Sequence, residues 1–355
     1  MLSLRIILAL IFVLFISGCS FEDEPTNEDE VNEAFARQAE IVTAELDIPW
    51  NITKQGDSFY LSQRAGKIIK VNEADGSKEI QNVEVTKQIL HESEGGFLGF
   101  ILAPDFESSG EAYGYHTYEA NGQVYNRIIL LKFTQNSWQE QEVILEGIPG
   151  GRIHNGGRIK IGIDGKLYAT TGDAGNPEYA QNLDNLAGKI LRMELDGSVP
   201  EDNPYPDSYI YSYGHRNPQG LAWDHDGKLY SSEHGQSAHD EINLIEPGKN
   251  YGWPLIEGEE QGAEMISPLY QTGTDTWAPS GIAIQDRKMF VATLRGESIR
   301  VVNLDTMKVD LAFENLGRLR DVFIENDTLY TITNNRDGRG TPREGDDKLF
   351  KLSLK

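Results

Sequence analysis

One strand pattern recurs along the chain and restricts the possible folds more than any other feature. Each copy follows a turn and alternates apolar residues around a central aromatic side chain. Alternation with a period of two residues is typical of β-strands. The copies are GDSFYLSQ (56–63), GEAYGYHTY (110–118), GKLYATTG (165–172), GKLYSSEHG (227–235), RKMFVATL (287–294) and NDTLYTITN (326–334).

The spacing of these copies predicts a repeat architecture. Their central aromatic residues are Tyr60, Tyr113, Tyr168, Tyr230, Phe290 and Tyr330. Each interval is long enough for four strands, and repeats of about 50 residues indicate a β-propeller. We therefore predict an all-β chain with a six-bladed β-propeller of four-stranded antiparallel blades at 41–355. A single blade cannot bury its faces, so the ring forms one domain. The alternative is a large β-sandwich with fortuitous spacing.

The N-terminus carries a targeting signal. Residues 6–16 form an apolar run behind Arg5 that is too short for a transmembrane helix and typical of a signal peptide. The run ends in Ile16-Ser17-Gly18-Cys19, which resembles a bacterial lipobox, and Cys19 is the chain's single cysteine. We predict that residues 1–18 are a lipoprotein signal peptide. Lipidation of Cys19 would then anchor the protein at the outer face of a bacterial membrane. An ordinary signal peptide is the alternative.

Charge excludes one class of partner. Residues 19–40 are acidic and poor in large apolar side chains, which predicts a disordered tether between the anchor and the folded part. The chain as a whole has 32 Lys and Arg against 56 Asp and Glu, a formal net charge of −24. Nucleic acid is therefore not an expected partner, because its phosphates would be repelled.

Polar motifs concentrate in the central third of the chain. They are HNGGR (154–158), GDAG (172–175), GHRNPQG (214–220), EHGQSAHDE (233–241) and NYGWP (250–254). His154 is followed by glycines, so it can face a cleft, and a carboxylate one strand away could orient its ring. A single histidine is more often structural, but clustered loops favour a site.

The segment from His234 to Tyr251 is a candidate site for a hard cation. Asp240 and Glu241 supply carboxylates, while Gly235, Gln236 and Tyr251 could add backbone carbonyls. Calcium takes six to eight oxygen ligands of both kinds. The spacing is not that of an EF-hand, so a solvated acidic loop is the alternative.

Several segments, in this order, resemble one known family. They are HNGGR, GDAG, LAGKILRMELDGSVPEDNP, GHRNPQG, DEINLIEPGKNYGWP, WAPSG and GRLRDV. They are similar to the glucose/sorbosone dehydrogenases, which include quinoprotein glucose dehydrogenases and aldose sugar dehydrogenases, over about residues 45–355. The resemblance implies a six-bladed propeller that uses pyrroloquinoline quinone (PQQ) and calcium. It also implies an aldose sugar substrate, whose C1 hydroxyl is oxidised to a lactone, and an unknown electron acceptor.

The resemblance also implies roles for individual residues. His154 matches the general base that removes the C1 hydroxyl proton, Asp173 the carboxylate that orients it, and Arg216 a cation that stabilises developing charge. Gly235 and Gln236 match carbonyls that hold cofactor-linked calcium, and Asp240, Glu241 and Tyr251 match a second calcium site. The cofactor-binding positions are Glu94, Arg216, Asn217, Thr276, Arg295, Arg318 and Arg320.

Two residues depart from the family pattern. Glu94 stands where the family has glutamine, and a carboxylate there would repel an anionic quinone unless a cation pairs with it or it stays protonated. Ile153 stands where some glucose dehydrogenases have aspartate, which weakens the case for glucose itself. Two other functions remain open: a calcium-dependent propeller lactonase, and a non-catalytic sugar-binding propeller on the cell surface.

Overall fold

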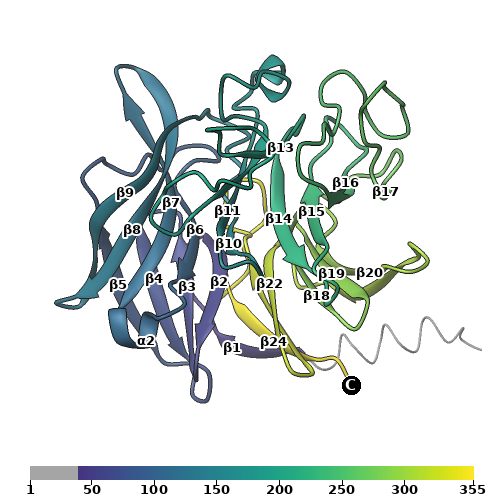
Figure 1. Cartoon of the computed structure of the whole chain (residues 1–355). Coiled ribbons are helices and arrows are strands. Elements are labelled where there is room, and N and C mark those ends of the chain that lie inside the picture. Colours follow the sequence, from purple (N-terminus) through teal and green to yellow (C-terminus); the bar gives the residue numbers. More distant parts are fainter. Residues whose placement is uncertain (1–38) are drawn as a thin grey trace, which may run out of the picture.

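The computed structural model describes residues 39–355, and the regular secondary structure in this range is almost entirely β-strand (Figure 1). Its helices are the single turns α2 (Phe106–Ser109) and η1 (Pro177–Ala180). The strands are β1 (Glu40–Thr43), β2 (Pro49–Gln55), β3 (Ser58–Gln63), β4 (Lys67–Asn72), β5 (Lys78–Glu84), β6 (Phe97–Leu102), β7 (Glu111–Ala120), β8 (Gln123–Thr134), β9 (Ser137–Pro149), β10 (Ile159–Ile161), β11 (Leu167–Thr171), β12 (Lys189–Met193), β13 (Ile210–Tyr213), β14 (Pro218–Trp223), β15 (Leu229–Glu233), β16 (Glu241–Ile245), β17 (Tyr270–Gln271), β18 (Pro279–Gln285), β19 (Lys288–Thr293), β20 (Ser298–Asn303), β21 (Val309–Glu314), β22 (Leu319–Glu325), β23 (Thr328–Thr333) and β24 (Leu349–Ser353).

These strands form four-stranded antiparallel units. Four sheets have the orders β10-β11-β12-β13, β14-β15-β16-β17, β18-β19-β20-β21 and β1-β24-β23-β22. The remaining sheet has eight strands, β2-β3-β4-β5-β9-β8-β7-β6, in which a short parallel pairing of β5 with β9 joins two antiparallel units. The predicted all-β class with four-stranded antiparallel sheets is confirmed.

The recurring sequence pattern has a single structural meaning. Its copies are β3, β7, β11, β15, β19 and β23. Each is the second strand of its unit when the sheet order is counted from the edge strand that precedes it in the chain, which is the first strand of the unit. All of the central aromatic side chains are buried, the most exposed being Tyr60 at 7%. A second strand is flanked on both sides by partners within its unit, so both of its edges are hydrogen-bonded.

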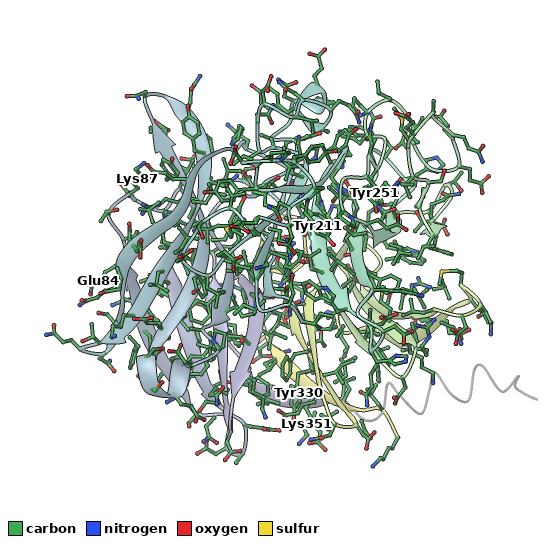
Figure 2. All side chains as sticks on the ribbon, viewed as in Figure 1. Glu84, Lys87, Tyr211, Tyr251, Tyr330 and Lys351 are labelled. Atoms are coloured by element: carbon green, nitrogen blue, oxygen red, sulfur yellow. The ribbon has the colours of Figure 1, made fainter. Side chains whose placement is uncertain are left out.

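The chain ends meet in one unit. β1 pairs antiparallel with β24, where Glu40 lies opposite Lys351. Tyr330 of β23 is the register partner of Lys351 on the other side of β24, and both are labelled in Figure 2. β1 begins at Glu40, the last residue assigned to the tether. The signal peptide, Cys19 and the rest of the tether lie outside residues 39–355, and no helix within that range is long and apolar enough to cross a membrane.

The core lies between successive units. Tyr60 packs with Phe97 and Phe100 of the next unit, and Tyr230 packs with Ile282 of the unit that follows it. The last unit also packs against the first, since Tyr330 and Phe59 share a cluster. In an antiparallel pair the first strand begins where the second ends. The starts of the first strands and the ends of the second strands therefore converge on one region.

Candidate active site

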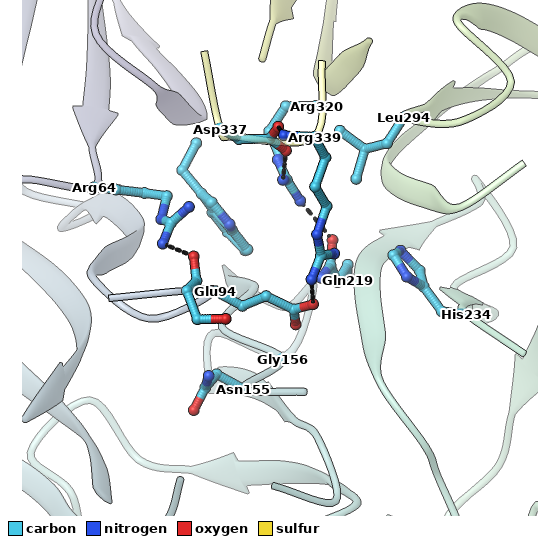
Figure 3. A pocket seen from close by; sticks show the side chains of 12 residues that line it. Arg64, Glu94, Asn155, Gly156, Gln219, His234, Leu294, Arg320, Asp337 and Arg339 are labelled. Atoms are coloured by element: carbon cyan, nitrogen blue, oxygen red, sulfur yellow. Dashed lines mark hydrogen bonds and ion pairs between the residues drawn. The ribbon is translucent and has the colours of Figure 1, made fainter. Parts of the chain in front are cut away.

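A pocket occupies this point of convergence (Figure 3). Every four-stranded unit contributes to it, from the loop before its first strand, the start of that strand or the loop after its second strand. The pocket holds about 450 Å³ of empty space that extends into solvent. The lining residues are Trp50, Arg64, Ser93, Glu94, Asn155, Gly156, Gln219, His234, Leu294, Arg320, Asp337 and Arg339.

A histidine–carboxylate pair stands beside the pocket. His154 lies in the loop before β10 and Asp173 in the loop after β11, and Nδ1 of His154 is 2.7 Å from Oδ1 of Asp173. Asp173 is fully buried, and its other oxygen accepts a 2.9 Å hydrogen bond from Nε1 of Trp253. With Asp173 accepting from Nδ1–H, the lone pair of the ring lies on Nε2. Nε2 has no hydrogen-bond partner among residues 39–355, and the side chain is 13% exposed.

The backbone of His154 is held in an unusual conformation. Its φ of 57° lies in the left-handed region, which side-chain-bearing residues seldom adopt. Its amide donates a 2.8 Å hydrogen bond to Oε2 of Glu94, and its carbonyl accepts from the amide of Ala174 at 3.1 Å. Glu94 and the Asp173 loop therefore hold the histidine from both sides.

Two arginines on and before β22 supply buried positive charge. Nη1 of Arg320 donates to Oε1 of Gln219 at 2.8 Å, and Nη2 of Arg318 is 2.9 Å from Asp337. Arg320 lies 3.7 Å from the same Asp337 carboxylate. Burial lowers the pKa of Arg320 to about 9, although Asp337 opposes this shift. An anionic ligand would offset the free-energy cost of burying the Arg320 charge.

Arg216 and Asn217 are fixed through Glu233. The Glu233 carboxylate accepts the backbone N–H groups of both residues, and it also lies 2.9 Å from Nδ1 of His215. The Arg216 guanidinium lies over the Trp253 ring, 5.3 Å from its centroid. The amide oxygen of Asn217 accepts from the N–H of Gly156 at 3.1 Å, next to the histidine. The structure thus brings His154, Asp173, Arg216 and Asn217 together.

Orphaned polar atoms indicate the kind of ligand that fits. Nε of Arg216, Nε of Arg318 and Nε2 of His234 are buried without a hydrogen-bond partner in the described part of the chain. Burial lowers the pKa of His234 to about 4, so this ring is neutral. Buried polar groups are normally satisfied. Unsatisfied arginine nitrogens around a pocket therefore fit a ligand rich in oxygen acceptors, above all carboxylates.

The loop after β15 presents carbonyl oxygens. No donor within residues 39–355 reaches the backbone carbonyls of Gly235 or Gln236, so both are available to a cation. Asp240 is differently engaged: Oδ1 accepts the N–H of Gly235 at 3.0 Å and Oδ2 accepts those of Trp277 and Ala278 at 2.6 and 2.8 Å. In this structure Asp240 ties the loop after β15 to the segment that precedes β18.

Glu241 lies in a second, smaller pocket beside Arg216. Glu233 and Glu257 also line this pocket. Burial and these two carboxylates raise the pKa of Glu241 to about 8. Within the described chain no three His, Cys, Asp or Glu side chains are arranged as a metal site. A cation here would depend on backbone carbonyls and would favour the ionised form of Glu241.

Tyr251 lines the same second pocket as Glu241, whereas Thr276 and Arg295 line neither of the two pockets. The Tyr251 hydroxyl is turned into the protein, where it donates to the carbonyl of Leu244 at 2.5 Å, so only its backbone could face a cation. Thr276 is partly buried, and its side chain has no hydrogen bond to another residue of the range 39–355. Arg295 is exposed, and only its backbone makes a hydrogen bond, to Trp277.

Sequence reasoning missed several lining residues. Trp50, Arg64, Gln219, Asp337 and Arg339 line the pocket but were not assigned to it. A signal was present in the repeat itself. Arg64, His234 and Leu294 each come directly after a recurring second strand, and all three line the pocket. In these three copies the residue after the second strand marks the pocket, whereas β7 is followed by Asn121, which lies in an exposed turn.

Comparisons with known proteins agree with this geometry. The sequence model of the family "Glucose / Sorbosone dehydrogenase" matches residues 46–342. The chain is 34% identical to quinoprotein glucose dehydrogenase B of Acinetobacter calcoaceticus over 282 residues, which are 69% of this chain and 59% of that protein. It is 28% identical to the aldose sugar dehydrogenase YliI of Escherichia coli over 345 residues, which cover 84% of this chain and 90% of that one.

A solved structure extends the likeness to three dimensions. The PQQ-bound form of the aldose sugar dehydrogenase of Streptomyces coelicolor superposes with a TM-score of 0.83 at 37% identity, covering 89% of this chain and 97% of that one. The fold and the site define a β-propeller of the sugar dehydrogenase type. The chain belongs to the glucose/sorbosone dehydrogenase family.

Proposed function

We propose that this protein is a six-bladed propeller that oxidises the C1 hydroxyl of aldose sugars to lactones, with PQQ and calcium. The blade count takes the two halves of the eight-stranded sheet separately. The observation that carries the proposal is the His154–Asp173 pair, 2.7 Å apart, beside a pocket with buried arginines. A lactonase has no need of a cationic cradle for several carboxylates, so the arginines favour the dehydrogenase.

His154 acts as the general base in this proposal. Its Nε2 takes the proton from the C1 hydroxyl, and Asp173 stabilises the imidazolium that forms. Trp253 keeps the Asp173 carboxylate in place through its 2.9 Å hydrogen bond. Arg216, stacked on the same Trp253 ring, places positive charge close to the reacting groups.

PQQ fits the donors that the pocket presents. When bound, it supplies the two-electron oxidant for the sugar. Arg318 and Arg320 would pair with its carboxylates, since both are buried and Nε of Arg318 lacks a partner among the described residues. Asn217, Thr276 and Arg295 are further proposed contacts. The carbonyls of Gly235 and Gln236 would hold cofactor-linked calcium, and a second calcium is proposed at Asp240, Glu241 and Tyr251.

Reconstitution of the purified apo-protein tests this function. We expect dye reduction with aldoses, accompanied by lactone formation, only when PQQ and calcium are both added. A chelator should also lower the melting temperature of the calcium-loaded, PQQ-free protein by several degrees, because a bound metal stabilises the folded state by mass action. Lactone hydrolysis without PQQ would support the lactonase instead. Sugar binding with neither reaction would support a non-catalytic receptor.

We also propose that Cys19 carries a lipid anchor on the outer face of a bacterial membrane. The support is the apolar run at 6–16 followed by Ile16-Ser17-Gly18-Cys19. Cells expressing the wild-type protein with labelled fatty acid should yield a labelled, membrane-associated product. Cys19→Ser should accumulate as an unlabelled precursor. Release of unlabelled wild-type protein into the medium would contradict the anchor.

A further inference from the structure

We propose that Glu94 and Arg339 work as one unit, an ion pair that closes one side of the pocket and positions His154. The pair makes an acidic residue at position 94 compatible with an anionic cofactor. Arg339 is then a positioning residue, because it acts on His154 through Glu94. This inference rests on the proposed function for its cofactor.

The ion pair joins two distant parts of the chain across the pocket. Glu94 lies in the loop between β5 and β6, and Arg339 in the loop between β23 and β24. Nη2 of Arg339 is 2.6 Å from Oε1 of Glu94, and both residues line the pocket. Figure 3 shows Arg339 extending toward the Glu94 carboxylate from the side of Arg320 and Asp337.

Glu94 connects Arg339 to His154 through its second carboxylate oxygen. Its Oε2 accepts the N–H of His154 at 2.8 Å, and its own N–H donates to the carbonyl of Arg152 at 3.0 Å. Arg64 fixes the same loop by donating to the carbonyl of Gly95 at 2.7 Å. Because His154 has a left-handed backbone, a lost hydrogen bond at its amide would let the ring move away from Asp173.

The charge of Glu94 is balanced by Arg339. Burial raises the pKa of the Glu94 carboxyl, but Arg339 and the His154 N–H lower it more, so its pKa lies below the usual value. Glu94 is therefore ionised and paired. Of the two possibilities that the sequence left open, a cation that pairs with Glu94 and a protonated Glu94, the structure favours the first. Without Arg339 it would present an uncompensated negative charge to an anion in the pocket.

Arg339 is itself held next to the cationic side of the pocket. Its N–H donates to Oδ1 of Asp337 at 2.9 Å, and Oδ2 of Asp337 pairs with Arg318 at 2.9 Å. The other charges near the pair include the cations Arg64, Arg216, Arg318 and Arg320, opposed by Asp337. The Glu94–Arg339 ion pair has no net charge, so it would not repel an anion that these arginines attract.

A double-mutant cycle tests the inference. Arg339→Gln should weaken PQQ binding about tenfold or more, because Glu94 is left unpaired. Glu94→Gln should bind PQQ at least as tightly as the wild type, and the double variant Glu94→Gln/Arg339→Gln should return to within about threefold of it. Arg339→Lys keeps the charge and should recover most of the loss. Arg343→Gln, in the same loop but outside the pocket, is the matched control and should bind normally.

Two readouts do not depend on PQQ. In the apo-protein, urea unfolding of the four members of the cycle should be non-additive, and the NMR signals of the His154 ring should shift in Arg339→Gln but not in Arg343→Gln. Additive unfolding with an unchanged His154 signal would overturn the ion pair. A double variant that binds PQQ as weakly as Arg339→Gln would overturn its role toward the cofactor. A wild-type protein that binds no PQQ would instead refute the proposed cofactor, and the apo-protein cycle would still decide the pair.

Discussion

His154→Ala should reduce sugar oxidation at saturating PQQ by about a hundredfold to ten-thousandfold, the usual effect of removing a general base. PQQ affinity should stay close to that of the wild type, because the proposed contacts with the PQQ carboxylates are arginines and not His154. The measurement is a PQQ titration by absorbance, followed by turnover at saturation. Wild-type turnover in this variant would refute the assignment of the base.

Two further variants distinguish the loss of the general base from a change in the backbone or in the position of the ring. His154 has a φ of 57°, a conformation that asparagine tolerates better than alanine, so His154→Asn tests the same loss with less backbone strain. Asp173→Asn should fall between the wild type and His154→Ala, since it disturbs the ring tautomer without removing the base. Equal activity of Asp173→Asn and the wild type would show that the 2.7 Å contact is structural only.

Arg320→Ala should differ from His154→Ala, with a large loss of PQQ affinity and a smaller loss of turnover at saturating PQQ. We expect PQQ affinity to fall about tenfold to a hundredfold, the range for losing a hydrogen bond to a charged group, and turnover to recover partly at high PQQ. Arg320 suits this role because it is 7% exposed and its hydrogen-bond partners, Gln219 and Asn334 at 2.8 Å, are neutral, with the Asp337 carboxylate farther away at 3.7 Å. The check is a comparison of the dissociation constant with turnover at saturating PQQ.

Arg320→Lys provides the control for Arg320→Ala. Lysine keeps the charge but loses the fork that contacts two partners at once, so its loss of affinity should be smaller. Thermal melts of the two apo-variants establish that each is folded. Unchanged PQQ affinity in a folded Arg320→Ala protein would show that the cofactor, if bound, lies elsewhere.

The local features of this protein were determined by its sequence. Strand periodicity depends only on neighbouring residues, so the amino-acid pattern of GKLYATTG and its relatives was enough to identify β11 and the other second strands. The turn-rich motifs HNGGR and GDAG marked His154 and Asp173 as candidates for a site, and the family resemblance implied that they are partners. The structure puts them 2.7 Å apart.

Only the tertiary structure decided which distant side chains meet. The partner of Glu94 is 245 residues away along the chain, and no local pattern could identify Arg339. Asp240 was predicted as a metal ligand from its sequence, but only the fold shows that its Oδ2 accepts the backbone amides of Trp277 and Ala278 in the segment before β18. Such contacts arise only when the units close on one another and the loops of all of them are brought to one centre. Periodicity along the chain specifies the strands, but the charge balance of the pocket depends on that closure.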